Sequence, residues 1–256
     1  MKHLDLFSGK GTFVERAKLL VPDYECVGVC EIDPFAQSLL IRHVEKGLLF
    51  DDIRSFQPSP SLKVDLLTGG FPCQDISIAK GKNARGLAGE KSGLWREMER
   101  CIRVLRPTYV VIENTSALLR RGLDTILANL ATMRYDAVWT MLSAAQCGYP
   151  HRRKRLFICA FNTDRIGREE VQFFARTITK ISQEEETRRK NIQQFRRLSG
   201  EGFWREDYAE FCRVDNGYSA ALNSARLRII GNAIIHENVD IILKSILFCN
   251  HFPEPP

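Results

Sequence analysis

The segment Gly70-Phe71-Pro72-Cys73-Gln74 could hold a reactive thiol on a stiff turn. It follows the apolar run Val64-Asp65-Leu66-Leu67, which is typical of a buried strand. Proline fixes one backbone dihedral and biases its predecessor toward extended geometry, and the preceding glycines permit a sharp exit from the strand. Cys73 is therefore a candidate nucleophile. The alternative is a structural cysteine in a loop, since free cysteine is among the most buried residues.

Two further turns carry useful side chains at the ends of apolar runs. Glu113 and Asn114 end the run Tyr109-Val110-Val111-Ile112, and the segment Asp5 to Gly11 ends the first run of the chain. A buried glutamate is rare without a partner, which favours a functional role for this one. The glycines after Asp5 let the backbone approach a ligand, although tight strand-to-helix turns need glycine anyway. The sequence thus places three reactive turns at three strand ends.

Strand-like apolar runs alternate with segments of helical spacing. Strands are predicted at residues 3–7, 25–30, 64–67, 109–112, 137–142 and 156–161. Helices are predicted from Leu94 to Leu105, ending before Pro107, and from Leu123 to Met133. This alternation favours an α/β fold with a mostly parallel sheet flanked by helices, in which ligands bind outside the carboxyl ends of the strands. All three turns lie on that edge.

The composition is that of an ordinary globular chain with a local excess of positive charge. The 256 residues, 44% of them hydrophobic, can form one full core and a small appended subdomain. The net charge is +6, but the positive charge is concentrated in two segments. The segment from Lys80 to Arg106 contains eight basic and three acidic residues, and the segment from Leu118 to Asn162 contains seven basic and two acidic residues. Such a surface suits nucleic acid, and a solvated basic face without a partner is the alternative.

The cysteine and hydropathy patterns exclude several classes of protein. The eight cysteines form no Cys-x-x-Cys pair and no histidine pair has zinc spacing, so no metal is expected. Cys30, Cys101 and Cys159 lie inside apolar patterns, which indicates reduced thiols in a cytoplasmic protein. No apolar segment approaches the length of a membrane span, so no membrane association is expected.

The pattern changes after Asn162 and predicts three regions. Residues 1–162 would form the main domain, residues 163–222 a short charged insertion, and residues 223–256 a segment that packs back on the main domain. Between residues 163 and 230 thirteen basic residues nearly balance eleven acidic ones. A solvated helix with ion pairs and a surface for direct nucleic-acid contact are both compatible with that balance.

Taken together, these motifs resemble, in order and over almost the whole chain, those of the DNA cytosine-5 methyltransferases, in particular compact phage, prophage or bacterial members. The resemblance implies a Rossmann-like fold that uses S-adenosylmethionine, with residues 163–222 as a small target-recognition insertion. It assigns the cofactor to residues at strand ends and in the final Gly231-Asn232-Ala233 motif. These residues are Asp5, Phe7, Ser8, Gly9, Gly11, Glu31, Asp52, Ile53, Pro72 and Asn232. Among them, Glu31 would accept hydrogen bonds from the ribose hydroxyls, whereas the nearby Asp33 could simply cap the next helix.

The resemblance also implies a mechanism. Cys73 would add to carbon 6 of a flipped-out cytosine, and Glu113 would hold ring nitrogen 3 and the exocyclic amine. The segment from Gly148 to Leu156 resembles the Gln-x-Arg-x-Arg motif of the family, with His151 in place of glutamine. Arg153 would face the base and Cys73, and Arg155 would brace the site or meet a phosphate. A plain basic turn is the alternative.

The resemblance predicts methylation of carbon 5 of cytosine in double-stranded DNA by a monomer. Two alternatives stay open: methylation of tRNA cytosine by the same site, and a silent DNA-binding homologue. The chain lacks the Cys-Phe-Thr signature expected of the tRNA enzymes, and it retains both Cys73 and Glu113, which silent homologues usually lose.

Overall fold

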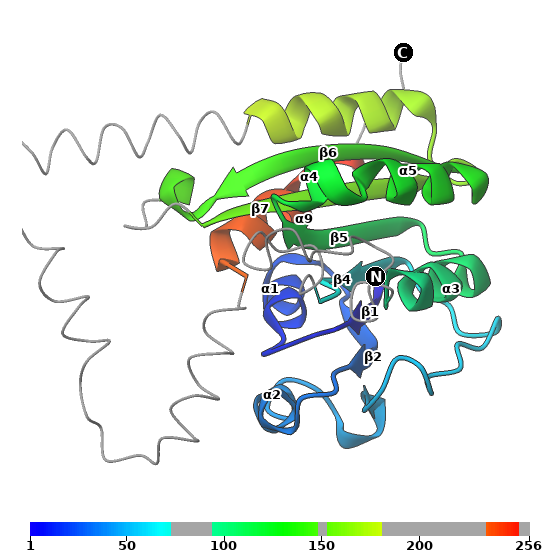
Figure 1. Cartoon of the computed structure of the whole chain (residues 1–256), viewed down its shortest axis with the longest axis vertical. Coiled ribbons are helices and arrows are strands. Elements are labelled where there is room, and N and C mark those ends of the chain that lie inside the picture. Colours follow the sequence, from blue (N-terminus) through cyan, green and yellow to red (C-terminus); the bar gives the residue numbers. More distant parts are fainter. Residues whose placement is uncertain (73–93, 148–152, 181–233, 251–256) are drawn as a thin grey trace, which may run out of the picture.

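The computed structural model describes residues 1–72, 94–147, 153–180 and 234–250. This part of the chain forms one seven-stranded sheet in the order β3-β2-β1-β4-β5-β7-β6 (Figure 1). The strands are β1 (Lys2–Leu6), β2 (Glu25–Cys30), β3 (Leu49–Phe50), β4 (Leu66–Gly69), β5 (Tyr109–Thr115), β6 (Tyr135–Ser143) and β7 (Lys154–Asn162). The helices are α1 (Thr12–Leu20), α2 (Pro34–Leu40), α3 (Trp95–Leu105), α4 (Leu118–Arg121), α5 (Leu123–Thr132), a helix over 168–180 and α9 (His236–Asn250), with short 3-10 turns at Lys46–Leu48 and Ala144–Cys147.

The direction of one strand sets the geometry of the sheet edge. Strands β3, β2, β1, β4 and β5 are parallel neighbours, whereas β7 runs antiparallel to β5 and to β6. The first residues of β7 therefore lie at the edge where β5 ends. The predicted mostly parallel α/β fold is confirmed, with this single reversal.

Helices cover both faces of the sheet. Helices α3, α4 and α5 pack on one face, where Met98, Ile102 and Ile126 are fully buried. Helices α1 and α9 and the helix over 168–180 pack on the other face, where Phe174 meets Phe161 with ring centroids 4.9 Å apart. Burial of apolar side chains on both faces explains why the central strands are almost continuously apolar.

The predicted strands are all present, with most bounds shifted by one or two residues, and two further differences bear on the site. Strand β3 was not predicted, because its two residues, Leu49 and Phe50, are too few to show a periodicity. Strand β5 runs to Thr115, so Glu113 and Asn114 lie within the strand and not on a turn after it. The reason is tertiary, since β7 pairs with β5 out to the register Thr115 to Arg155 and so extends the ladder beyond the apolar run.

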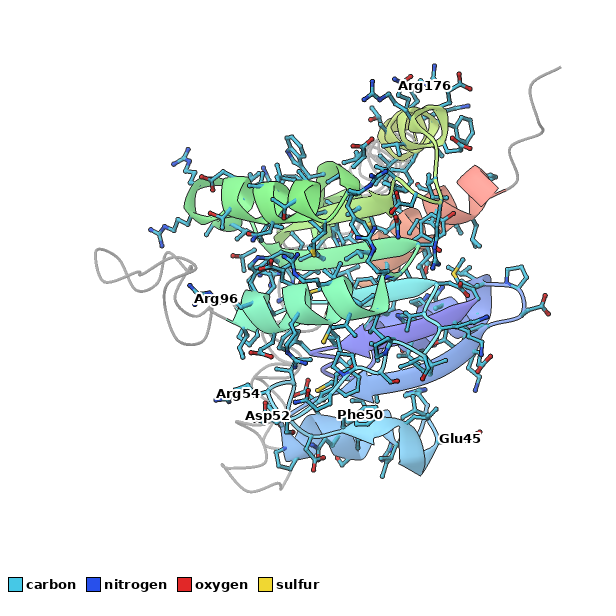
Figure 2. The ribbon with its side chains drawn as sticks, turned by 90° about the vertical axis from the view of Figure 1, so that its right-hand side faces the viewer. Glu45, Phe50, Asp52, Arg54, Arg96 and Arg176 are labelled. Atoms are coloured by element: carbon cyan, nitrogen blue, oxygen red, sulfur yellow. The ribbon has the colours of Figure 1, made fainter. Side chains whose placement is uncertain are left out.

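The helix over 168–180 belongs to the core of the described protein. Its apolar residues Val171, Phe174 and Ile178 are buried in the cluster that includes Phe161, while Arg176 points outward (Figure 2). The start of the predicted 163–222 insertion thus packs on the sheet, and α9, from the predicted C-terminal segment, packs against α1. The division into three regions stays a prediction, because residues 181–233 lie outside the described residues.

Within residues 1–72, 94–147, 153–180 and 234–250, no cluster of three or more His, Cys, Asp or Glu side chains could hold a metal ion. In the same ranges, no helix is both long enough and apolar enough to span a bilayer. The cysteines described there, Cys26, Cys30, Cys101, Cys147 and Cys159, are free thiols.

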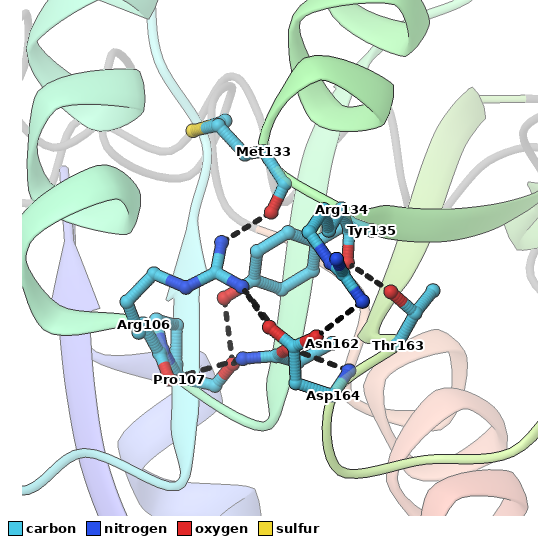
Figure 3. Close-up of polar contacts among 8 residues, drawn as sticks. All are labelled: Arg106, Pro107, Met133, Arg134, Tyr135, Asn162, Thr163 and Asp164. Atoms are coloured by element: carbon cyan, nitrogen blue, oxygen red, sulfur yellow. Dashed lines mark hydrogen bonds and ion pairs between the residues drawn. The ribbon is translucent and has the colours of Figure 1, made fainter.

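A polar cluster joins three chain segments at the sheet edge opposite the carboxyl ends of the parallel strands (Figure 3). Arg106, in the left-handed region with φ 48°, donates to the carbonyl oxygen of Met133 and to Asp164 Oδ2 at 2.9 Å. Its guanidinium lies 5.1 Å from the centre of the Tyr135 ring. Asn162 Oδ1 accepts the backbone N–H of Asp164, at 3.1 Å. These contacts fix the start of β6 and the end of β7 relative to α3.

We expect Arg106→Ala to lower the free energy of unfolding by about 2 kcal/mol, because the Met133 carbonyl and Asp164 both lose a charged donor. The matched control is Arg134→Ala, since Arg134 pairs with the same Asp164 but its side chain is 71% exposed. Exposed pairs contribute about 0 to 1 kcal/mol, so the control should change little. Equal losses in urea unfolding of the two variants would contradict a structural role specific to Arg106.

Candidate active site

A cavity of about 520 Å³ lies at the carboxyl edge of the parallel strands. Its walls come from the turns after β1, β2, β3 and β4 and from the end of β5. This is the edge where α/β sheets bind ligands, and the size is that of a small-molecule site.

The turn after β1 is held in an unusual backbone conformation. Phe7, a residue with a large side chain, adopts a φ of 55°, which residues other than glycine seldom do. Gly11 has a φ of 85°, which residues with a side chain rarely adopt, and a Cβ there would lie 2.7 Å from the Leu40 side chain, so a larger residue would be strained and would displace that side chain. The Gly9 N–H donates to Glu31 Oε2 at 2.7 Å, which ties this turn to the end of β2.

Glu31 accepts backbone hydrogen bonds and faces the cavity. Its Oε1 accepts the Asp33 N–H at 2.8 Å, in addition to the bond from Gly9 to Oε2. Burial raises its pKa, against the effect of these two hydrogen bonds. Each carboxylate oxygen keeps lone pairs for a further donor. Asp33 caps α2 by accepting from the Phe35 and Ala36 N–H groups, as the sequence allowed.

One end of the cavity lies at the turn after β3. Asp52 accepts the Arg54 N–H at 2.9 Å and pairs with its side chain, and both residues lie at this end of the sheet (Figure 2). Arg100 of α3 donates to the Ile53 carbonyl at 2.9 Å and to the Phe56 carbonyl at 2.8 Å. Because α3 is part of the core, these bonds fix the turn that carries Asp52 and Ile53.

The end of the cavity at β5 holds a buried ion pair. Glu113 of β5 is 8% exposed, and its Oε1 lies 2.8 Å from Arg155 Nε. Arg155 stands opposite Thr115 in the ladder, so it shares a sheet face with Glu113 two residues away. Burial raises the pKa of Glu113, and the charges of Arg155 and Arg153 partly offset that rise.

The turn after β4 is fastened to the same strand. Asn114 Nδ2 donates to the Phe71 carbonyl at 3.1 Å, and Asn114 Oδ1 accepts the Thr115 N–H at 2.8 Å. A Cβ on Gly70 would lie 2.9 Å from Glu113 Oε2, so glycine lets the carboxylate approach the chain just before Pro72. These contacts bring the Phe71-Pro72 turn against Glu113 and Asn114.

A row of buried polar side chains lies beneath the cavity. Tyr24 Oη lies 2.9 Å from His3 Nδ1, and His3 Nε2 lies 2.7 Å from Thr68 Oγ1. Thr68 in turn donates to Asp5 Oδ1 at 2.5 Å. Since the threonine proton points to Asp5, His3 must donate from Nε2 and accept at Nδ1 from the tyrosine hydroxyl. Burial raises the pKa of Asp5 to about 7, against the hydrogen bond from Thr68.

The structure brings most of the predicted site residues to one cavity. The residues in its lining are Asp5, Phe7, Ser8, Gly9, Glu31, Asp52, Ile53, Pro72, Glu113 and Arg155. Gly11 and Arg153 lie outside the lining, Gly11 against α2 and Arg153 just before β7. Cys73 and Asn232 lie outside the described residues.

Sequence reasoning did not assign several of the lining residues to the site, among them Lys10, Ile32 and Asn114. Ile32 is 60% exposed on the cavity wall, where an apolar side chain can cover a flat ring. An apolar residue between Glu31 and Asp33 at a strand end was the available signal. Asn114 was noted only as part of a motif, and its bond to Phe71 depends on how β4 and β5 pair.

The sheet and the cavity at its carboxyl edge define a Rossmann-like α/β fold. The chain resembles the solved structure of the Entamoeba histolytica methyltransferase EhMeth, with a TM-score of 0.54, 18% identity, and coverage of 64% of this chain and 53% of that one. The family model for the C-5 cytosine-specific DNA methylases matches residues 1–212. The chain belongs to that family.

Curated relatives include bacterial and phage enzymes. The type II methyltransferase M2.BsuMI of Bacillus subtilis is 32% identical over 168 residues, covering 62% of this chain and 42% of the relative. The orphan methyltransferase M.SPRI of Bacillus phage SPR is 27% identical over 176 residues, covering 66% of this chain and 40% of the relative. This chain thus spans less than half the length of these curated relatives.

We expect the stability of the His3→Phe variant to depend on pH differently from that of the native chain. Burial lowers the pKa of His3 to about 3, whereas the unfolded chain binds this proton below its ordinary value of 6.5. Relative to the variant, the native protein should therefore lose up to about 1.4 kcal/mol per pH unit as the pH falls below 6.5, because only the native chain has this proton-binding site. Urea unfolding at pH 7 and pH 5 measures this difference.

The control for this variant is His43→Phe, because His43 is exposed. It should leave the pH dependence of unfolding unchanged. A His3→Phe variant whose stability relative to the native chain is the same at both pH values would show that the folded protein does not hold this ring neutral.

Proposed function

We propose that this chain transfers a methyl group from S-adenosylmethionine to carbon 5 of cytosine in double-stranded DNA. The observation that carries the proposal is the buried Glu113–Arg155 pair, which lies beside the Phe71-Pro72 turn on the wall of a ligand-sized cavity. Cys73 follows Pro72 directly in the sequence. A nucleophile and a partnered acid at the ends of adjacent strands are what addition to cytosine requires.

The cavity residues fit S-adenosylmethionine. Glu31 keeps acceptor capacity for ribose hydroxyls, and Ile32 offers an apolar wall for adenine. Asp52 and Ile53, at the same end of the cavity, would also contact the adenine. Within the described ranges, the buried Asp5 Oδ2 has no hydrogen-bond partner, which is typical of a polar site prepared for a ligand or water. When bound, this cofactor supplies an electrophilic methyl group.

Glu113 would act on the cytosine ring. The raised pKa favours the protonated form of Glu113, which can donate its proton to ring nitrogen 3 as negative charge develops there. Arg155 keeps the carboxyl group oriented and lets it return to the charged form. Without the two arginines, burial alone would favour the neutral acid still more strongly.

Cys73 would be the nucleophile. Its thiolate would add to carbon 6 of the flipped-out base, and nearby arginine charge favours the thiolate form. Arg153, two residues before Arg155, would provide such charge and contact the base. Release of Cys73 then requires loss of the carbon 5 proton to a base.

We further infer that the protein is a monomer and that it acts on DNA in the cytoplasm.

We expect Cys73→Ala to abolish methylation. Base-resolution methylation sequencing of DNA from a methylation-free host should show 5-methylcytosine in one sequence context with the native chain and none with the variant. Binding of S-adenosylhomocysteine should persist in the variant, because the thiol is not part of the cofactor site. Methylation retained by Cys73→Ala would overturn the mechanism. Absent DNA methylation with methylated cellular tRNA would favour the tRNA alternative.

We expect Glu113→Gln to lower the turnover number by about 10²- to 10⁴-fold, because the amide cannot donate the catalytic proton. Methyl incorporation into a DNA duplex of the identified sequence measures the rate. The matched control is Glu99→Gln on α3, where Glu99 forms an ion pair with Arg103 away from the cavity. Equal rates for the native chain and Glu113→Gln would remove Glu113 from the chemistry.

A further inference from the structure

The cavity walls carry more acidic than basic side chains. Its described carboxyl groups belong to Asp5, Glu31, Asp33, Asp51, Asp52 and Glu113, and its cationic groups to Lys10, Arg54 and Arg155. Unless a cation is available to pair with it, an anionic ligand group would be repelled here. S-adenosylmethionine carries such a group, the carboxylate of its amino-acid end.

Two of the three cations are already paired. Arg155 lies 2.8 Å from Glu113 and Arg54 lies 3.3 Å from Asp52. Lys10 differs, because the contact its ammonium makes with the rest of the described chain is to a ring nitrogen, His236 Nε2, at 3.1 Å. Within those ranges no carboxylate lies within ion-pair distance of Lys10, so its charge is available.

The contact with His236 orients Lys10 without neutralising it. An ammonium group can only donate, so Nε2 is the acceptor in this contact. The Glu15 carboxylate lies 3.5 Å from the same Nε2 and faces His236 from α1. The lysine therefore has one of its three donors engaged by this ring nitrogen and two donors left for a ligand.

The position of His236 is itself well fixed. Arg16 of α1 donates to both carboxylate oxygens of Asp240 on α9, at 2.7 and 2.8 Å. Val239 and Ile242 of α9 are fully buried. Helix α9 thus holds His236 next to the turn that carries Lys10, although 226 positions separate the two residues in the chain.

The strand order gives the direction of the bound cofactor. Asp52 and Ile53, proposed for adenine, follow β3, and Glu31, proposed for ribose, follows β2. The next strand in the sheet is β1, followed by β4 with the Phe71-Pro72 turn. A ligand laid along this edge with adenine at β3 brings its amino-acid end to the turn after β1, where Lys10 and Ile234 line the cavity.

We propose that Lys10 binds the carboxylate of the amino-acid end of S-adenosylmethionine, with His236 as the positioning residue that holds its ammonium. This inference rests on the proposed function, since it assigns the residue that binds one end of that cofactor. A charge-assisted hydrogen bond in a partly buried cavity discriminates strongly between ligands that have the carboxylate and ligands that lack it.

The test compares two probes by isothermal titration calorimetry: S-adenosylhomocysteine and its decarboxylated analogue, which keeps the adenosine, the thioether and the amine. We expect Lys10→Gln to weaken S-adenosylhomocysteine about tenfold and to leave the analogue unchanged or slightly tighter. His236→Glu should act in the same direction, because a carboxylate would cancel the lysine charge. His236→Gln, which keeps an acceptor, should retain most of the discrimination.

The matched control is Lys18→Gln, at the exposed end of α1, which should alter neither affinity. Thermal unfolding of each variant checks that the fold is intact. Equal weakening of both probes by Lys10→Gln, or no weakening of either, would overturn the role of Lys10 while leaving the proposed function in place. A native chain that binds neither probe would instead overturn the proposed function, and this inference with it.

Discussion

The buried carboxylate of Glu113 depends on the guanidinium of Arg155, and the arrangement of the site depends on that pair. Burying a charged carboxylate alone would cost several kcal/mol, so a partner has to arrive from elsewhere in the fold. Strand β7 provides it because it runs against β5 and begins at the edge where β5 ends. A parallel strand at this place would put its last residues there instead. The reversal of one strand is thus linked to the chemistry at Glu113.

The same edge gathers the remaining parts of the site through short polar links between strands. Glu31 accepts from Gly9 and so joins the ends of β2 and β1, while Asn114 donates to Phe71 and joins β5 to the turn after β4. Arg100 supports the turn after β3 from below. Each link uses a backbone group that a turn would otherwise leave without a partner. The cavity is therefore built largely before any ligand enters it.

The strands and helices could be predicted well because their periodicity is strong. The run Tyr109 to Ile112 shows a buried strand, and the spacing from Leu94 to Leu105 shows a helix that ends before Pro107. Strand β3 could not be predicted, since two residues carry no period. The inclusion of Glu113 and Asn114 in β5 could not be predicted either, since polar residues extend a strand only when a neighbour pairs with them.

The sequence by itself determined the α/β class, the order of the motifs and the residue types that could do chemistry, because these depend on local periodicity and on covalent neighbours such as Pro72 and Cys73. The tertiary structure decided which groups meet. Arg155, and not Arg153, forms the ion pair with Glu113, and His236 contacts Lys10 from the far end of the chain. Such contacts follow from strand direction, register and helix packing, which place residues together over distances that no local pattern encodes.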